Sequence, residues 1–263
     1  MRKYWAFCKI TWQQTIAYRG ESIVWFILEA IPMVYMMNLW ISLQKFGRIS
    51  TDTAGWLITY QFLTLCIARL TAHHFDDWVI DDIKDGSISK NLLKPFSFKG
   101  YLMANELTWR ISGLIYLIPT FLVLIPVRYL LSTVHLQFQQ LLFVIILLIT
   151  SFFQRFFVSY MITLAAYWFD QASFLIHLKW MFEGMFGGAW LPIEFFPMWL
   201  RIVSSMTPFY FWFTLPIRGL IQPIPISEQL IYVSVSILWV LLLYVLSRFL
   251  EKRALLKYSA TGN

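Results

Sequence analysis

Long apolar segments are the feature of this sequence that most limits how the chain folds. A helix needs about 20 apolar residues to cross the roughly 30 Å of hydrocarbon in a bilayer. The six segments that approach or exceed this length are 22–43, 56–75, 105–126, 141–169, 174–191 and 230–249. Backbone polar groups in hydrocarbon must be hydrogen-bonded internally, so each segment is expected to be helical. The sequence therefore predicts an all-α integral membrane protein, with six transmembrane helices in a single domain covering residues 1–263.

The composition points to the same class. Of the 263 residues, 59% are apolar and 13% are charged, whereas an average soluble domain has about 25% charged residues. A soluble globule of this size would have too few charges to cover its surface, which excludes a water-soluble single domain. The aromatic share of 19% fits a protein with two membrane–water interfaces, because amphipathic rings are enriched at headgroup depth.

Basic residues in the short loops predict the orientation of the chain. With both termini inside, 12 Lys and Arg residues lie on the cytoplasmic side and five on the opposite side. The cytoplasmic set is Arg2, Lys3, Lys9, Arg19, Lys84, Lys90, Lys94, Lys99, Arg248, Lys252, Arg253 and Lys257; the opposite set is Lys45, Arg48, Arg128, Arg201 and Arg218. This excess favours cytoplasmic termini. The charges flank the spans and form no single basic face, so nucleic acid is not predicted as a partner.

Residues 1–20 are expected to form a separate helix at the membrane surface. Trp5, Cys8, Trp12 and Ile16 recur at helical spacing, with polar residues off that stripe. This pattern is typical of an interfacial helix that lies flat on the cytoplasmic leaflet. Gly20 would then allow the turn into the first span, and the alternative is an extension of that span.

The segment 76–100 is the one inward loop long enough to make a partner surface. Asp76 or Asp77 is placed to cap a short helix, and Gly86 to end it in the left-handed conformation. A second short piece, 89–93, ends ahead of Pro95. The loop either docks a partner protein or only connects and shields the bundle.

The tract between the fifth and sixth spans is apolar but interrupted. Its prolines are Pro192, Pro197, Pro208, Pro216, Pro223 and Pro225, which forbid one continuous helix. We expect short helical pieces within 187–225 that fold back into the outer leaflet without crossing it, packed closely at Gly187 and Gly188. Glu194 within this tract is either a gate carboxylate that contacts the exported molecule or a headgroup-level residue that reaches water.

Ionisable residues inside spans are costly and therefore candidates for function. Those in the predicted spans include Glu29, Arg69, Glu106, Arg110, Arg155, Lys179 and Glu183. Matched depth predicts a Glu29–Arg69 contact, and i,i+4 spacing predicts the pairs Glu106–Arg110 and Lys179–Glu183. Arg155 has no obvious partner and is expected to face the bundle interior. The leading interpretation is a structural charge layer near the inner leaflet, and the alternative is contact with substrate.

Catalytic and metal-binding patterns are missing from the sequence. No Gly-Lys dipeptide occurs, so the chain holds no Walker A loop. ATP and Mg²⁺ would therefore be bound by a separate ATPase, and no cofactor is predicted for this chain. His73 and Asp77 share a helical face, but two such ligands do not close a coordination sphere, so no metal site and no enzymatic activity are predicted.

The order of these parts resembles the membrane-spanning subunits of ABC-2 type ATP-binding-cassette transporters, in particular bacterial permeases of about this length. The resemblance rests on the basic amphipathic N-terminus, the six spans, and two runs of motif residues. The first run is Gly86, Ile88, Leu92, Leu93 and Pro95; the second is Gly187 to Pro192, Phe195 to Pro197, Trp199, Leu200, Pro208, Phe209, Pro216 and Gly219. It covers nearly the whole chain.

The resemblance implies a permease of the bacterial inner membrane that forms a homo- or heterodimer, recruits ABC ATPase subunits and exports a hydrophobic or amphiphilic substrate. It implies that the first inner loop is a coupling helix seated in the ATPase, with the contact carried by Trp78, Val79, Asp82, Ile83, Gly86, Ile88, Leu92, Leu93 and Pro95. It also implies an outer gate around Gly187, Gly188, Pro192, Glu194 and Pro197. Permeases of this plan carry drugs, peptides, lipids or glycans, so the resemblance defines the scaffold and not the cargo.

Two other classes compete with an ATP-driven permease. A passive channel or ion-coupled carrier would more usually show midplane ionisable groups or repeats, and only Arg155 lies there, with no internal repeat. An intramembrane enzyme would need a nucleophile, a carboxylate pair or a metal cluster, and none is indicated.

Overall fold

The computed structural model describes residues 2–92, 97–124 and 137–261, and this part of the chain is helical with no strand. Five helices are long: α2 (Arg19–Lys45), α3 (Thr51–Thr71), α6 (Phe98–Leu124), α8 (Phe138–Ala165) and α12 (Ile226–Thr261). At 1.5 Å per residue each is at least about 30 Å long. They overlap the first, second, third, fourth and sixth predicted spans, although α6 begins seven residues earlier and α12 ends twelve residues later than predicted. By length and composition, α8 and α12 are the two described helices that qualify as candidate membrane spans.

The fifth predicted span is shorter than expected. Helix α9 runs over Phe174–Phe186, which is 13 residues or about 20 Å, and so falls short of the bilayer core. It begins where the sequence indicates, but ends five residues early because the chain bends at Gly187 and Gly188. The expected span 174–191 is therefore wrong in its length.

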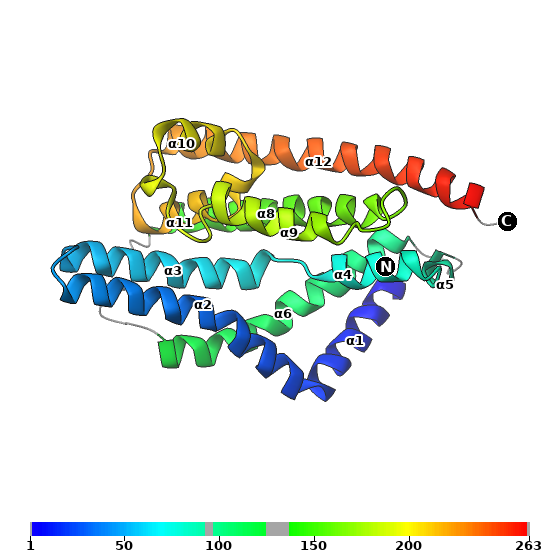
Figure 1. Ribbon diagram of the computed structural model, residues 1–263, viewed down its shortest axis with the longest axis horizontal. Helices are drawn as coiled ribbons and strands as arrows, with labels where there is room; N and C mark the ends of the chain where they lie inside the picture. Colours follow the sequence, from blue (N-terminus) through cyan, green and yellow to red (C-terminus); the bar gives the residue numbers. More distant parts are fainter. Residues whose placement is uncertain (1, 93–96, 125–136, 262–263) are drawn as a thin grey trace.

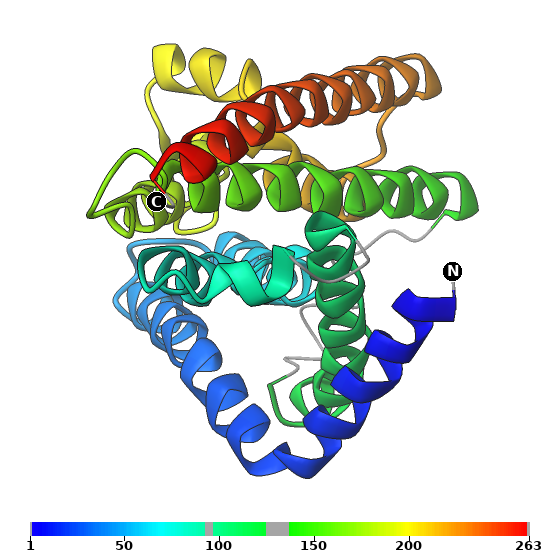
Figure 2. The ribbon, with the colours of Figure 1, turned by 90° about the vertical axis from the view of Figure 1, so that its right-hand side faces the viewer.

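The N-terminal segment forms a separate helix, α1 (Arg2–Ala17), that lies across α6 (Figure 2). The turn into α2 falls at Tyr18 and not at Gly20, which is already helical. Thr11 and Thr15 form the buried side of α1, and the Thr11 hydroxyl donates a hydrogen bond to the Asn105 amide oxygen at 2.8 Å. The predicted apolar stripe is divided: Trp5 and Ile16 face outward, with Trp5 76% exposed, whereas Cys8 and Trp12 are half-buried and the Cys8 thiol contacts the Ala104 carbonyl of α6.

Short helices gather at the two ends of the long ones. Helices α4 (Phe75–Lys84) and α5 (Ile88–Leu92) lie at the same end as both termini (Figure 1). At the other end lie η1 (Ile193–Phe195), α10 (Met198–Ser205), η2 (Pro208–Phe211) and α11 (Thr214–Ile221). The broken helical pieces predicted within 187–225 are confirmed.

Helix α8 occupies the centre and contacts α12, α11, α4 and α3. Its Leu147 and Phe156 are fully buried. By contrast, α12 exposes large apolar side chains along most of its length, with Leu238 65% and Val245 61% exposed. A polar centre around α8, described below, and an apolar exterior are the distribution expected of a protein solvated by lipid.

Candidate functional site

The hairpin formed by α4 and α5 closes the end of the molecule that carries the termini. Gly86 has a φ of +72° and ends the turn after α4 in the left-handed conformation, as predicted. The Ser87 hydroxyl donates to the Asp82 carboxylate at 2.8 Å and so ties the turn back to the helix. No side chain caps α4. Asp76 and Asp77 lie in its first turn, so their predicted capping role is wrong.

Some side chains of the hairpin are buried against the bundle, and others are exposed. Val79 and Ile88 are each 1% exposed and pack in one cluster with Phe75 and Phe156. Trp78 and Ile83 are half-buried at the edge of that cluster. The remaining surface is charged, with Asp77, Asp81, Lys84, Asp85 and Lys90 exposed and Asp82 half-buried. Of the other predicted contact residues, Leu93, Pro95 and the side chain of Leu92 lie outside the described residues.

A buried ion pair joins the hairpin to α9. The Lys179 ammonium donates to the Asp76 carboxylate and, at 3.1 Å, to the Ser159 hydroxyl of α8. Asp76 is 1% exposed and Lys179 is 5% exposed. Ile80 of α4 packs against Ile176 of α9 beside this contact. The consecutive helices α8 and α9 and the distant α4 therefore meet at one ammonium group.

A second buried ion pair lies one helical turn farther along α9. The Arg155 guanidinium donates to the Glu183 carboxylate at 2.7 Å and to the Thr71 hydroxyl at 3.0 Å. It also lies 5.3 Å and 4.9 Å from the ring centroids of Trp212 and Phe213. Arg155 faces the interior as expected, but it does have a partner.

The predicted Lys179–Glu183 pair is therefore wrong. Both residues lie on one face of α9 at i,i+4 spacing, yet each bonds to a different element. A local i,i+4 pair contributes only about 0.2–0.5 kcal/mol. Leaving Asp76 and Arg155 buried without a partner would cost several kcal/mol each. The tertiary pairs therefore prevail.

The third charged group includes the predicted Glu106–Arg110 pair, which forms at 3.2 Å. Glu106 also lies 3.1 Å from Nδ1 of His73, whose Nε2 is 3.0 Å from the Phe152 carbonyl oxygen. Both ring nitrogens of His73 are thus engaged in hydrogen bonds to α6 and α8. No group of three or more candidate metal ligands occurs in the part of the chain that the structure describes.

The Glu29–Arg69 contact is not tested, because the side chain of Glu29 lies outside the described residues. The backbone carbonyl of Arg69 accepts a hydrogen bond from Arg110 at 3.2 Å. Arg69 therefore lies beside the Glu106 group, and the pairing with Glu29 stays a prediction.

Sequence reasoning missed the contact between Lys99 and α12. The Lys99 ammonium lies 3.3 Å from the Glu251 carboxylate and 4.7 Å from the centroid of the Tyr160 ring. Burial lowers the pKa of Lys99, and Glu251 opposes that shift. On the hairpin, burial raises the pKa of Asp77, with the neighbouring Asp76 carboxylate adding to it. No short-range spacing signals the Lys99 contact, because its partners lie 61 or more positions along the chain.

At the opposite end the chain bends tightly at the two predicted glycines. A Cβ atom on Gly187 would lie 2.5 Å from the Glu183 carbonyl oxygen, and Gly188 has a φ of +76°. The Thr214 hydroxyl donates to the Gly187 carbonyl at 2.8 Å, and the Tyr60 hydroxyl donates to the Gly188 carbonyl at 2.9 Å. The close backbone approach predicted for both glycines is confirmed.

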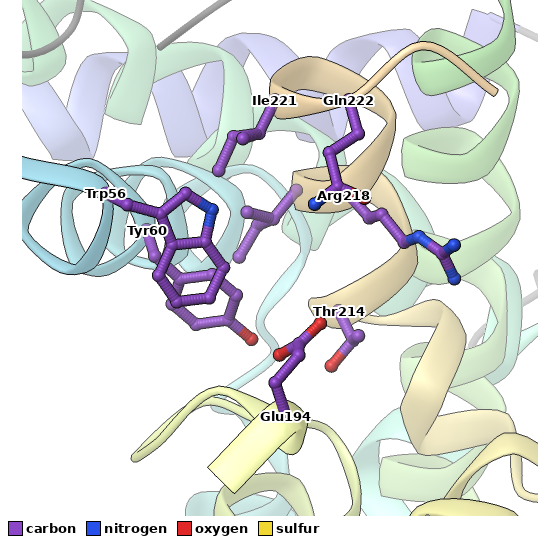
Figure 3. A pocket seen from close by; sticks show the side chains of 8 residues that line it. Trp56, Tyr60, Glu194, Thr214, Arg218, Ile221 and Gln222 are labelled. Atoms are coloured by element: carbon purple, nitrogen blue, oxygen red, sulfur yellow. The ribbon is translucent and has the colours of Figure 1, made fainter. Parts of the chain in front are cut away.

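An open pocket lies beside this bend, and Figure 3 shows the residues that line it. The enclosed part of this hollow has a volume of only about 10 Å³, which is room for no more than a water molecule, and the rest is open to solvent. Its lining consists of Trp56, Tyr60, Glu194, Thr214, Ile217, Arg218, Ile221 and Gln222. Of the predicted gate residues, Gly187, Gly188 and Glu194 meet here. Pro192 is buried nearby, whereas Pro197 is exposed at the start of α10.

Long apolar helices around a charged interior, with folded pieces at both ends, are the architecture of a helical membrane protein. The chain belongs to the ABC-2 transporter family: the family profile described as "ABC-2 family transporter protein" matches residues 22–262. It is thus a permease component of an ABC-type transporter, a class that works with ATPase subunits. No curated protein and no solved structure gives a significant match to the chain.

Proposed function

We propose that this permease forms the substrate path of an exporter, as a dimer with itself or a close relative. Two separate ATPase subunits would bind ATP and Mg²⁺ and drive it from the cytoplasmic side of a bacterial inner membrane. Family membership supports the class. The position of α4, α5 and both termini at one end supports placing the ATPases there (Figure 1), since the charge bias puts that end inside.

The α4–α5 hairpin is the proposed ATPase contact. Its exposed face carries Asp77, Asp81 and Asp85 around the half-buried Trp78. An aromatic residue ringed by charge is a common interface composition. The three carboxylates, partly offset by the exposed Lys84 and Lys90, leave the hairpin weakly acidic, which suits a basic surface on the ATPase. Val79 and Ile88 hold the hairpin to the bundle in this proposal, and Trp78, Asp82 and Ile83 meet the partner.

The observation that carries the proposal is the buried contact of Asp76 with Lys179 and Ser159. A hairpin that only shielded the bundle would not need a charge of its own bonded inside it. Through this contact a displacement of α4 reaches α9. At the other end of α9, the backbone carbonyls at Gly187 and Gly188 accept hydrogen bonds from α11 and α3. Rigid-body movement of α9 would therefore act on the proposed outer gate.

The test measures ATPase recruitment and stimulation by the permease in nanodiscs. Asp81→Lys reverses an exposed charge on α4 and leaves the buried side untouched, while Trp78→Asp places a charge in the apolar contact. Both variants should lose binding of the cognate ATPase and stimulation of ATP hydrolysis. Glu228→Lys, an equally exposed reversal at the start of α12, is the matched control and should behave as the parent protein.

Folding is checked by the thermal midpoint of each purified variant. Normal ATPase binding and stimulation in Asp81→Lys and Trp78→Asp would sink the assignment of the hairpin. A loss that Glu228→Lys shared would also do so, because it would reflect net charge.

A further inference from the structure

The outward face of α12 changes from apolar to basic near its C-terminal end. Leu238, Val245 and Phe249 are exposed and follow one another along this face at spacings of seven and four residues. Lys252 and Arg253 come three and four positions after Phe249 and are also exposed. Residues three and four apart are neighbours on a helix surface. The two cations therefore flank the Phe249 ring at the end of the apolar face.

The position of these cations along α12 matches the headgroup layer of a bilayer. The predicted span ends at Phe249, so Lys252 and Arg253 lie about 4.5–6 Å past the hydrocarbon at 1.5 Å per residue. The headgroup layer on each side of a bilayer is about 5–8 Å thick. This part of α12 lies at the same end of the molecule as the α4–α5 hairpin (Figure 1), which the charge bias places on the cytoplasmic side.

The positive charge of this segment is not neutralised within the protein. Glu251 is the one acidic residue in the C-terminal half of α12. Its carboxylate lies 3.3 Å from the Lys99 ammonium and 3.6 Å from the Arg248 guanidinium, and so is already shared by two cations. In the described parts of the chain, neither Lys252 nor Arg253 forms an ion pair. Both charges are therefore available to an anion from outside the chain.

The end of the helix does not account for the two cations. A helix dipole favours basic side chains only in the last turn, and α12 continues to Thr261, eight positions past Arg253. The guanidinium carbon of Arg253 lies 4.4 Å from the centroid of the Phe249 ring, which holds this side chain back towards the bilayer. A guanidinium over a ring keeps N–H groups that can bind a phosphate in bidentate fashion.

We propose that Lys252 and Arg253 bind the phosphate of an anionic phospholipid in the cytoplasmic leaflet, whose acyl chain lies along the apolar face that ends at Phe249. Two adjacent cations attract an anionic headgroup and repel the cation of a zwitterionic one. A phospholipid fits the charge and the adjoining apolar face together, whereas an acidic protein surface would match the charge alone. The inference goes beyond the proposed function, since it involves neither the cargo nor the ATPase.

The test is native mass spectrometry of the purified permease in a non-ionic detergent, titrated with phosphatidylglycerol or with phosphatidylcholine. One basic residue near an anionic surface changes binding by about fivefold. Lys252→Gln with Arg253→Gln should therefore weaken phosphatidylglycerol binding by about tenfold or more and leave phosphatidylcholine binding unchanged. Lys45→Gln with Arg48→Gln is the matched control, because it removes one Lys and one Arg from exposed positions near the opposite end. Both affinities of the control should equal those of the parent protein.

Thermal midpoints in lipid-free detergent check the folding of each variant. If the double variant unfolds, Lys252→Gln alone is measured, with an expected loss of about fivefold in phosphatidylglycerol binding. Unchanged phosphatidylglycerol binding in the folded variant, or an equal loss in the control, would overturn the proposal. Displacement of the lipid by soluble glycerol phosphate would also overturn it, because the site would then recognise a free phosphate. Loss of ATPase binding with lipid binding intact would assign these cations to a protein partner instead.

Discussion

The buried contact between Asp76 and Lys179 leads to the sharpest prediction. With 1% and 5% of their surfaces exposed, neither charge has access to bulk water. Asp76→Asn removes the countercharge and leaves the Lys179 ammonium with neutral acceptors, namely the new amide oxygen and the Ser159 hydroxyl. Lys179→Met leaves the Asp76 carboxylate in an apolar surrounding that includes Ile80 and Ile176. Each single change therefore strands a buried charge.

The expected magnitude follows from that burial. Removing one partner of a buried ion pair costs about 3–5 kcal/mol, whereas replacing both by neutral residues of similar volume is often neutral or stabilising. For a chain of this size a destabilisation of 1 kcal/mol lowers the thermal midpoint by about 2–4 °C. Each single variant should therefore lose about 6–20 °C, and Asp76→Asn with Lys179→Met should recover most of it.

Thermal unfolding of the four proteins in one detergent gives the double-mutant cycle. Arg248→Gln is the matched control, because Arg248 is 53% exposed and forms only a surface bridge to Glu251, which is worth at most about 1 kcal/mol. If the two single effects add within about 0.5 kcal/mol, the residues do not interact and the argument fails. A transport assay on the neutral double variant is the second measurement. The variant should be stable, yet its transport should be poorly coupled to ATP hydrolysis. Full transport would refute the proposal that α9 transmits the movement.

Two further predictions concern the outer bend and the first span. Gly188→Ala should lower the thermal midpoint more than Gly47→Ala, because both glycines have positive φ, but only at Gly188 would the new Cβ meet neighbouring atoms; equal shifts would mean that the hydroxyl packing contributes nothing. Exchanging Glu29 and Arg69 should restore folded yield that either single replacement loses; a swap expressed no better than the singles would contradict their pairing.

The elements were predictable where a local rule decides the outcome. The spacing of apolar runs located the five long helices, although α6 begins seven residues before and α12 ends twelve residues after the predicted bounds. Gly86 ended its turn in the left-handed conformation because few other residues adopt it at low cost. Glu106 and Arg110 pair as expected, since the bond they form lies within one helix. These features depend on residues fewer than ten positions apart.

The charged interior was only partly predictable, because its partners are chosen in three dimensions. Arg155 has no acidic residue within one helical turn in the sequence, and Glu183 reaches it only after the chain turns back between α8 and α9. Because Glu183 then bonds to Arg155, Lys179 pairs with Asp76 and not with Glu183. A pattern rule that sees only i,i+4 neighbours therefore selects the weaker pair. The hydrogen bonds that Tyr60 and Thr214 donate to the glycine bend were missed for the same reason, since the two residues lie 154 positions apart.

The short length of α9 fits the role proposed for it. The helix has 13 residues, and its contacts with α4 at Ile176 and Lys179 lie 11 and 8 positions before Gly187. Lys179 and Glu183 fix two successive turns to surrounding helices, and Glu183 is five residues before Gly188. A helix held at two adjacent turns moves as one body. In the proposed coupling, movement received at Asp76 would therefore shift the carbonyls of Gly187 and Gly188 to which Thr214 and Tyr60 donate, and so would act on the outer bend.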